Sequence, residues 1–205
     1  MVIGLTGPTG SGKSTVANIL IGQGFSLIDC DRVARQVVLP GSVCLKQLTA
    51  GFGEDILLED GTLDRKKLAS IAFPDPQKHQ ELNRIMFFWI LKAIKQQIEQ
   101  LKREGAHILM DAPTLFESGA DSLCDRVLVV ISSREKRLLR IMKRDKIDEK
   151  SATDRMNAQK QDIFYRTRAD FIIENNRGEA DLKREAHRFL LWLNGQENVP
   201  DQGSK

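Results

Sequence analysis

Five short apolar runs punctuate the chain, and each has the length and composition of a buried strand. They span residues 2–6, 25–29, 106–112, 126–132 and 170–174. The clearest is RVLVVIS at 126–132, a β-branched run bounded by polar residues. Because stretches with helical periodicity separate the runs, the pattern predicts a parallel sheet with right-handed crossovers and helices on both faces.

The spacing of these runs is uneven, because residues 30–105 separate the second run from the third. Ordinary connections in α/β units take only ~2–6 residues. Within the long segment, residues 64–73 begin with a capping aspartate and end before Pro74, and residues 76–104 repeat apolar side chains at helical steps of three and four. We therefore predict a helical insertion packed on the sheet.

The pattern as a whole predicts one domain at residues 1–195, with a core made of residues 1–58 and 105–195. The helical insertion is placed at about 59–104 and a lid at about 134–160. The last residues, 196–205, are polar with glycine and proline, which predicts a flexible tail.

Charge and cysteine content narrow the class of protein. The 31 basic and 28 acidic residues leave a net charge of +3, which is too balanced to indicate nucleic-acid binding. No apolar run approaches ~18 residues, so no membrane span is expected, and the first residues lack the layout of a signal peptide. Three cysteines with no C-x-x-C pair fit a reducing cytosol rather than a zinc site or a disulfide framework. A cytoplasmic location is expected.

The segment GPTGSGKS directly after the first run matches the pattern G-x-x-x-x-G-K-[ST]. Glycines allow successive backbone N–H groups to curl around phosphate oxygens, and the following helix directs its positive end at them. The lysine reaches the β- and γ-phosphates, and the serine hydroxyl ligates Mg²⁺. The alternative is a glycine-rich strand–helix turn, which would not need Lys13 and Ser14. The predicted cofactors are ATP and Mg²⁺, held by Gly10, Ser11, Gly12, Lys13, Ser14 and Thr15.

Three aspartates follow predicted strands, at the edge where ligands of open parallel sheets bind. Asp29 and Asp31 follow the second run, and Asp111 lies near the end of the third with the form of a Walker-B carboxylate that supports Mg²⁺. We assign Asp31 as the base that accepts the proton of a hydroxyl substrate, with Asp29 as the second choice. Capping of the helix that follows is the competing interpretation for Asp31.

After the fourth run, Arg137, Arg140 and Arg144 recur at helical spacing and share one face. A solvated charged face is the commoner outcome of such a run. Here the helix precedes the last strand, where P-loop kinases carry a mobile lid whose arginines neutralise the transferring phosphoryl group. We expect Arg144 to act first, Arg140 next and Arg155 less. Nucleic-acid binding by this helix is disfavoured because no aromatic residues interleave with the basic ones.

In order and spacing, these residues resemble the dephospho-coenzyme A kinase family over nearly the whole chain. The resemblance rests on these positions: 4–7 with 10–15; 28–31 with 34–35 and 40–41; 61 with 63–65, 68 and 73; 82–83 with 85; 111 with 113 and 115–117; 144–145; and 155, 158–159, 169–170 and 175. It implies a P-loop NTPase fold, a three-layer α/β sandwich with a five-stranded parallel sheet, a helical acceptor-binding insertion and a lid. The implied enzyme is a phosphotransferase with an alcohol acceptor.

The resemblance also implies a reaction and a substrate. The reaction is ATP-dependent phosphorylation of the ribose 3′-hydroxyl of dephospho-coenzyme A, the last step of coenzyme A synthesis. It implies Asp31 as the base, Lys13 and Arg144 as catalytic residues, and Arg140 and Asn175 on the nucleotide, with Asn175 near adenine. The implied acceptor contacts are Asp29, Arg35, Leu63, Asp64, Arg65, Asn83, Pro113 and Glu117. Ser14 and Asp111 are the implied metal residues. The expected partner is a small molecule, with no nucleic acid and no membrane, for a monomer or weak homo-oligomer.

The sequence departs from the family pattern at Phe87 and Phe88, where the family usually has His-Pro. Without proline the helix is expected to run unbroken. Without the histidine, a polar group that could touch the acceptor is lost.

Two rival functions are considered. The first is a small-molecule P-loop kinase for another acceptor, which Leu63-Asp64-Arg65 disfavours. The second is a non-catalytic nucleotide-binding module, which is disfavoured because Lys13 and Asp31 are both present.

Overall fold

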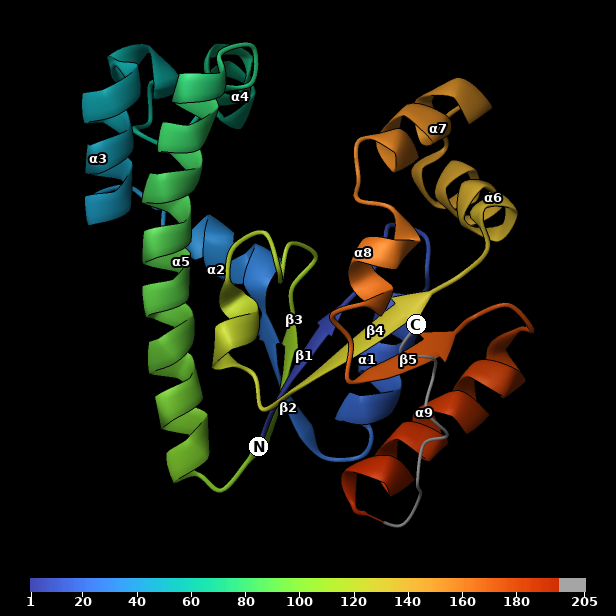
Figure 1. The fold of residues 1–205 in the computed structure, drawn as a ribbon. Helices are drawn as coiled ribbons and strands as arrows, with labels where there is room; N and C mark the ends of the chain where they lie inside the picture. The colour runs from blue at the N-terminus through green and yellow to red at the C-terminus, as the bar shows by residue number, and fades with distance from the viewer. Residues whose placement is uncertain (196–205) are drawn as a thin grey trace.

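The computed structural model describes residues 1–195 of the chain (Figure 1). The tail predicted at 196–205 lies outside the described residues. A five-stranded sheet has the order β2-β3-β1-β4-β5, and every neighbouring pair is parallel. The strands are β1 Val2–Thr6, β2 Phe25–Asp29, β3 His107–Asp111, β4 Arg126–Ile131 and β5 Phe171–Glu174. The predicted parallel sheet is confirmed.

Helices cover both faces of this sheet and make a three-layer sandwich. Helices α1 (Lys13–Ile21) and α9 (Glu179–Leu193) bury Leu20 and Phe189 against the side chains of one face. Helices α2 (Cys30–Gln36), α5 (Pro76–Arg103) and α8 (Asp162–Arg166) pack on the other face. The strands are therefore buried on both sides, which is why they read as continuous apolar runs.

A separate apolar cluster holds the helices that extend beyond the sheet between β2 and β3. Helices α3 (Val43–Phe52) and α4 (Arg65–Ala72) pack with the first half of α5, and the short 3₁₀-helix η1 (Glu54–Ile56) lies between α3 and α4 in the chain. The buried members of this apolar cluster are Val38, Cys44, Leu48, Ile56, Leu68 and Ile85. Helix α3 belongs to this cluster although it precedes residue 59, the expected start of the insertion. The division of the domain stays a prediction, and the shared core favours an earlier start.

Helix α5 is continuous from Pro76 to Arg103, as expected for a segment without an interior proline. The Asp75 carboxylate accepts hydrogen bonds from the N–H groups of Gln77 and Lys78, and Pro76 occupies the first turn, where its missing N–H costs nothing. The Phe87-Phe88 pair lies within this unbroken helix, and Phe88 is exposed.

On the other side of the sheet, α6 (Arg134–Asp145) and α7 (Glu149–Asn157) form a helical pair with its own small core. Ile141 of α6 packs with Ala152 and Met156 of α7. A second short 3₁₀-helix, η2 (Ala120–Leu123), precedes β4. Figure 1 shows α3 and α4 beyond one side of the sheet and α6 and α7 beyond the other. The carboxyl ends of the strands face the region between these two groups, which is where the site is built.

Candidate active site

The phosphate loop between β1 and α1 has a backbone that only glycine can adopt at key positions. Gly10 and Gly12 have φ angles of 76° and 102°. A Cβ at Gly7 would lie 2.0 Å from the Val130 carbonyl oxygen, and one at Gly12 would lie 2.2 Å from Asn175 Nδ2. The loop is therefore pressed against β4 and against the residue that follows β5, and the glycines of the motif are required by this close approach.

Several N–H groups of this loop are free to bind an anion. Among residues 1–195, the backbone N–H groups of Gly10, Gly12, Lys13 and Ser14 donate to no protein acceptor. They lie at the start of α1, where the helix dipole also favours negative charge. The Lys13 ammonium donates to the Gly7 carbonyl oxygen at 2.7 Å, which holds it over the loop. Burial lowers the pKa of Lys13, and the charges of Asp111 and Asp31 oppose that shift. An anion in the loop would supply the missing negative charge.

A cavity of about 410 Å³ opens at this loop and collects most of the predicted chemistry. It is lined by Thr9, Gly10, Gly12, Lys13, Ser14, Asp31, Asp111, Pro113, Arg140, Arg144 and Gln159. The glycine loop, the two carboxylates and the two arginines come from four different segments of the chain. The sheet brings them together because the phosphate loop follows β1, and the carboxyl ends of β1, β2 and β3 lie at the same edge of the sheet.

The carboxylates divide into different structural roles. Asp29 and Asp111 are register partners at the ends of β2 and β3. The Asp29 carboxylate accepts a hydrogen bond from the Arg32 N–H at 2.9 Å and so caps α2. Asp31 lies in the first turn of α2, exposed and on the wall of the cavity. The capping role considered for Asp31 thus belongs to Asp29.

Asp111 is held in a partly dehydrated position. Burial raises its pKa, the charge of Lys13 opposes the shift, and Asp29 and Asp31 add to it. Lys13 and Asp111 both shift toward their neutral forms, so burial outweighs their mutual attraction. Asp111 Oδ1 is buried and has no hydrogen-bond partner among the described residues. A buried carboxylate oxygen without a partner is costly unless a ligand satisfies it.

These residues fit a magnesium ion that arrives with a nucleotide. Magnesium prefers oxygen ligands and commonly uses one or two carboxylates together with phosphates and water. The cavity offers the Ser14 hydroxyl and the unpartnered Asp111 oxygen. Residues 1–195 contain no group of three or more His, Cys, Asp or Glu side chains that could hold an ion alone. The remaining ligands would therefore have to be phosphate oxygens and water.

Three of the four arginines of α6, namely Arg137, Arg140 and Arg144, have different environments. Arg144 is exposed and is held by Asp145 through two hydrogen bonds of 2.7 and 2.9 Å, and Arg155 binds the same carboxylate at 2.6 Å. Arg140 donates to the carbonyl oxygens of Gly10 and Ser11. Arg137 is buried behind the loop. Arg140 and Arg144 therefore line the cavity, whereas Arg137 contacts the loop at Thr9 and does not line the cavity.

Several residues implied by the resemblance do not line this cavity. Asn175 is buried, and its side-chain amide donates to the Ser11 carbonyl oxygen at 2.8 Å. This contact supports the phosphate loop, and the adenine contact stays a prediction. Asp64 caps α4 by accepting from the Lys67 N–H. The others outside the cavity lining are Asp29, Arg35, Leu63, Arg65, Asn83 and Glu117.

Two cavity residues, Thr9 and Gln159, were not among the predicted site residues. The Gln159 side-chain oxygen accepts a hydrogen bond from the Thr9 N–H at 2.8 Å. Thr9 is a variable position of the motif, and only the pair at 158–159 in the family resemblance pointed to Gln159. A contact between residues so far apart in sequence has no local signal.

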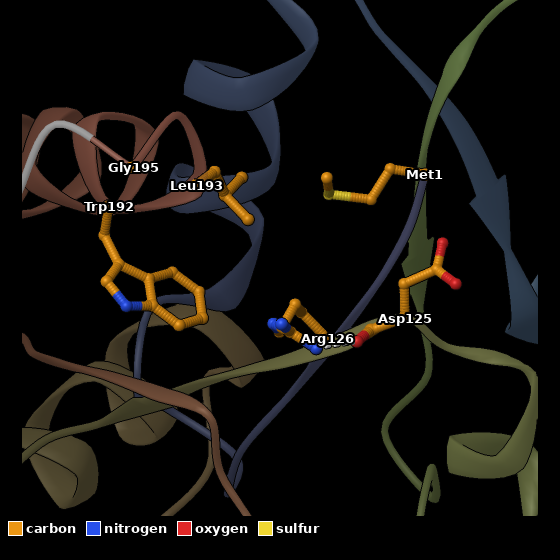
Figure 2. A pocket seen from close by; sticks show the side chains of 6 residues that line it. All are labelled: Met1, Asp125, Arg126, Trp192, Leu193 and Gly195. Carbon is orange, nitrogen blue, oxygen red and sulfur yellow. Dashed lines mark hydrogen bonds between the residues drawn. The ribbon is translucent and has the colours of Figure 1, made fainter.

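A second cavity, of about 390 Å³, lies at the amino ends of the strands, away from Asp31 and Asp111 (Figure 2). Met1, Asp125, Arg126, Trp192, Leu193 and Gly195 line it. The Asp125 carboxylate already accepts from the Val2 N–H at 2.7 Å, and Trp192 packs on Phe171 and Phe189. None of the predicted site residues lines this cavity.

A parallel sheet with a phosphate loop after its first strand, carboxylates at the adjacent strand ends and arginines on an adjacent helix defines a P-loop kinase. A sequence model of the family described as dephospho-CoA kinase matches residues 1–181. The chain is 39% identical over 189 residues to the dephospho-CoA kinase of Listeria monocytogenes, covering 92% of this chain and 94% of that protein. It is 39% identical to that of Shewanella oneidensis, with 98% of each chain covered. The chain belongs to the dephospho-CoA kinase family.

Solved structures agree with this assignment. A Thermus thermophilus protein superposes with a TM-score of 0.81 at 28% identity, covering 94% of this chain and 97% of that one. Dephospho-CoA kinase from Campylobacter jejuni superposes with a TM-score of 0.71 at 29% identity, covering 96% and 98%. Shikimate kinase from Acinetobacter baumannii, at 18% identity and a TM-score of 0.52, shares the fold. The protein is thus a kinase that uses ATP to phosphorylate dephospho-CoA, the final step of CoA synthesis. None of its described helices is long and apolar enough to cross a bilayer.

Proposed function

We propose that the cavity at the phosphate loop binds the triphosphate of ATP beside the ribose of dephospho-CoA, and that Asp31 accepts the proton of the ribose 3′-hydroxyl. The observation that carries this proposal is that Asp31 and Lys13 line the same cavity, with Asp31 exposed. A base must reach the acceptor hydroxyl while the phosphates lie against the loop. The arrangement meets both requirements in one place.

The nucleotide end of the site is formed by main-chain groups. The N–H groups of Gly10, Gly12, Lys13 and Ser14 have no protein acceptor and would bind phosphate oxygens. Lys13 would lie over the β- and γ-phosphates, where bound anion offsets the burial that lowers its pKa. With these contacts, the γ-phosphorus would lie in the cavity rather than in solvent.

The acceptor end depends on Asp31. When the ribose oxygen bonds to the γ-phosphorus, the bond from that phosphorus to the leaving oxygen of ADP breaks, and the hydroxyl proton passes to an Asp31 carboxylate oxygen. Asp31 is exposed before substrate binds and is not used as a helix cap, since Asp29 has that role. The carboxylate is therefore available to accept a proton.

Charge that develops on the transferring group needs a cation on the side away from the loop. Arg144 lines the cavity from α6, and its guanidinium is held by Asp145 through two hydrogen bonds. Such a held arginine loses less freedom when it meets the transition state. We assign Arg144 to this role and Arg140 mainly to the loop, because Arg140 donates to two loop carbonyls and to Asn175.

Magnesium, when bound with ATP, would neutralise phosphate charge and hold the phosphates in position. Ser14 and Asp111 would hold it, directly or through water. Asp111 is suited because its unpartnered oxygen is buried at the end of β3. The raised pKa of Asp111 would fall again beside a divalent cation.

The helical unit of α3, α4 and the first half of α5 would receive the rest of dephospho-CoA. It has its own apolar core and lies beyond the strand ends on the side of α2 (Figure 1). The proposed contacts at Leu63, Asp64, Arg65 and Asn83 all belong to this unit. Pro113 lines the cavity, and Arg35 and Glu117 are the remaining proposed contacts.

The chain would act as a monomer or weak homo-oligomer in the cytoplasm. The three cysteines are free thiols, as a reducing compartment maintains.

A coupled assay of ADP release with Mg·ATP and dephospho-CoA tests the proposal. We expect ADP release that depends on dephospho-CoA, with phosphorus and proton NMR placing the new phosphate on the ribose 3′ oxygen. Adenosine and shikimate serve as comparison acceptors. A higher kcat/KM for a nucleoside, or a phosphate placed elsewhere on the ribose, would overturn it.

A further inference from the structure

Three consecutive carbonyl groups on the outer side of the phosphate loop are held by side chains from the last third of the chain. The Thr9 carbonyl accepts from Arg137 Nε at 3.0 Å. The Gly10 and Ser11 carbonyls accept from Arg140, and the Ser11 carbonyl also accepts from Asn175. Because a peptide unit is planar and trans, fixing a carbonyl outward turns the N–H of the next residue the other way.

Thr9 is unusual among these residues because both of its backbone polar groups are bound by distant side chains. Its N–H donates to Gln159 Oε1 at 2.8 Å, and its carbonyl accepts from Arg137. The next peptide N–H belongs to Gly10, which has no protein acceptor in residues 1–195. The contacts at Thr9 therefore set the direction of the first free N–H group of the anion cradle.

Burial of the charged Arg137 side chain costs free energy unless partners compensate the charge. Only 6% of the residue is exposed. Its Nη1 donates to Asp162 Oδ1 at 2.9 Å, and this is the ion pair that compensates the buried charge. Its Nε remains for Thr9. The planar guanidinium thus spans the distance from α8 to the loop with fixed geometry, which a lysine with one point of charge could not do.

The backbone of α6 reinforces this contact. A Cβ at Gly10 would lie 2.8 Å from the Arg137 carbonyl oxygen and 3.1 Å from its Cα. Arg137 therefore contacts the loop twice, through its side chain at Thr9 and through its main chain at Gly10. The first turns of α6 are anchored to the loop, whereas Arg144, two turns further along, reaches the cavity.

We propose that Arg137, held by Asp162 and assisted by Gln159, is a positioning residue that fixes the Thr9–Gly10 peptide so that the Gly10 N–H faces the phosphates. Arg137 itself does not line the active-site cavity. The inference rests on the proposed nucleotide role of the loop. It adds a set of residues outside the phosphate motif that determines how well the motif binds.

The experiment compares Arg137→Lys, Arg137→Ala and Asp162→Asn with wild type and with Arg134→Ala. Arg134 is one turn earlier on α6 and binds only Asn157 among the described residues, so it controls for loss of a positive charge on this helix. Calorimetry gives the Kd of Mg·ATP, steady-state kinetics give KM for each substrate, and thermal unfolding gives Tm. The amide NMR signal of Gly10, followed during titration with a non-hydrolysable ATP analogue, reports the N–H itself.

Arg137→Lys retains a cation for Asp162 but loses the bridging Nε contact. We expect its Kd and KM for ATP to rise about 10-fold, as loss of one charge-assisted hydrogen bond predicts. KM for dephospho-CoA should stay within about twofold, and the ATP-induced shift of the Gly10 signal should shrink. Asp162→Asn should give a smaller change in the same direction, and Arg134→Ala should match wild type.

A purely structural Arg137 would lower Tm but leave the Kd for ATP and the Gly10 shift of Arg137→Lys unchanged, and that result would overturn the inference. If Arg137→Ala fails to fold, Arg137→Lys and Asp162→Asn still decide the question. Failure of the proposed function would appear differently, as wild-type protein that binds Mg·ATP normally but does not phosphorylate dephospho-CoA. Nucleotide binding by the Arg137 variants does not depend on the acceptor.

Discussion

Asp29 and Asp111 are register partners on adjacent parallel strands, so their carboxylates leave the sheet at the same edge. Asp29 uses its oxygen to cap α2, and Asp111 has a buried oxygen without a protein partner. Asp31, two residues after Asp29, is on the cavity wall and exposed. One carboxylate thus orders a helix, one is suited to a cation and one is available for proton transfer.

Replacement of Asp31 by asparagine should remove the proton acceptor while keeping the size of the side chain. We expect kcat to fall by at least ~10²-fold, with the Kd of Mg·ATP changed by less than about threefold. Stopped assays of ADP formation measure the first quantity, and calorimetry measures the second. Near-normal turnover would mean that Asp31 has no role in proton transfer.

Arg144→Ala tests whether Arg144, near the end of α6, stabilises the transition state of phosphoryl transfer. The contact matters most while charge spreads over the transferring group, so kcat should fall by ~10²-fold or more while the affinity for ATP changes little. Lys143→Ala, an exposed neighbour on the same helix, is the matched control and should behave as wild type. A change confined to KM for ATP would assign Arg144 to ground-state binding instead.

Asp111→Asn tests the metal role of the β3 carboxylate. The amide keeps the shape but loses the charge that a divalent cation requires, so the concentration of Mg²⁺ needed for half-maximal activity should rise about 10-fold or more. Titration of activity with Mg²⁺ at fixed ATP measures this. An unchanged Mg²⁺ requirement would show that Asp111 does not support the ion.

Cys30 gives a prediction for alkaline pH. Burial, followed by the charges of Asp111, Asp31 and Asp29, raises the pKa of its thiol from 9.0 to about 12. The unfolded chain loses this proton near pH 9 and the folded chain retains it, so the stabilising contribution is complete below pH 9 and is lost as pH rises toward 12.

Between pH 7 and pH 10, the free energy of unfolding of wild type should therefore fall by about 1 kcal/mol more than that of Cys30→Ala. Urea unfolding at the two pH values measures the difference. Ser26→Ala provides the reference, because Ser26 lies on β2, the strand that directly precedes Cys30, and has no titrating group. Equal losses in wild type and Cys30→Ala would mean that the thiol titrates normally in the folded protein.

The parts of the fold that could be predicted are those with a strong local pattern. The strand containing Val127 to Val130 is apolar on both faces because helices cover both sides of the sheet, and α5 repeats its apolar side chains over 28 residues. Helix α3, which buries Cys44 and Leu48, was not predicted, because it packs against other helices of its unit and not against the sheet. The five-residue helix α8 carries too little periodicity to be recognised.

The candidate site was predictable to the same degree. The phosphate motif fixes Lys13 and Ser14 through its own spacing, and strand ends locate Asp31 and Asp111. The function of Arg137 could not be found this way, since it depends on contacts with Thr9 and with Asp162 that are distant in sequence. Helical spacing placed Arg137 with Arg140 and Arg144, but helix packing turns it toward the interior.

If the three carbonyl contacts shape the phosphate loop as we propose, they also determine when a newly made chain can bind ATP. The loop is translated first, but its supports at Arg137, Arg140 and Asn175 come from the last part of the chain. A nascent polypeptide that ends before β4 would contain the whole phosphate motif and still lack the groups that shape it. Emergence of β4, α6 and β5 from the ribosome is then the step at which the chain becomes able to capture nucleotide.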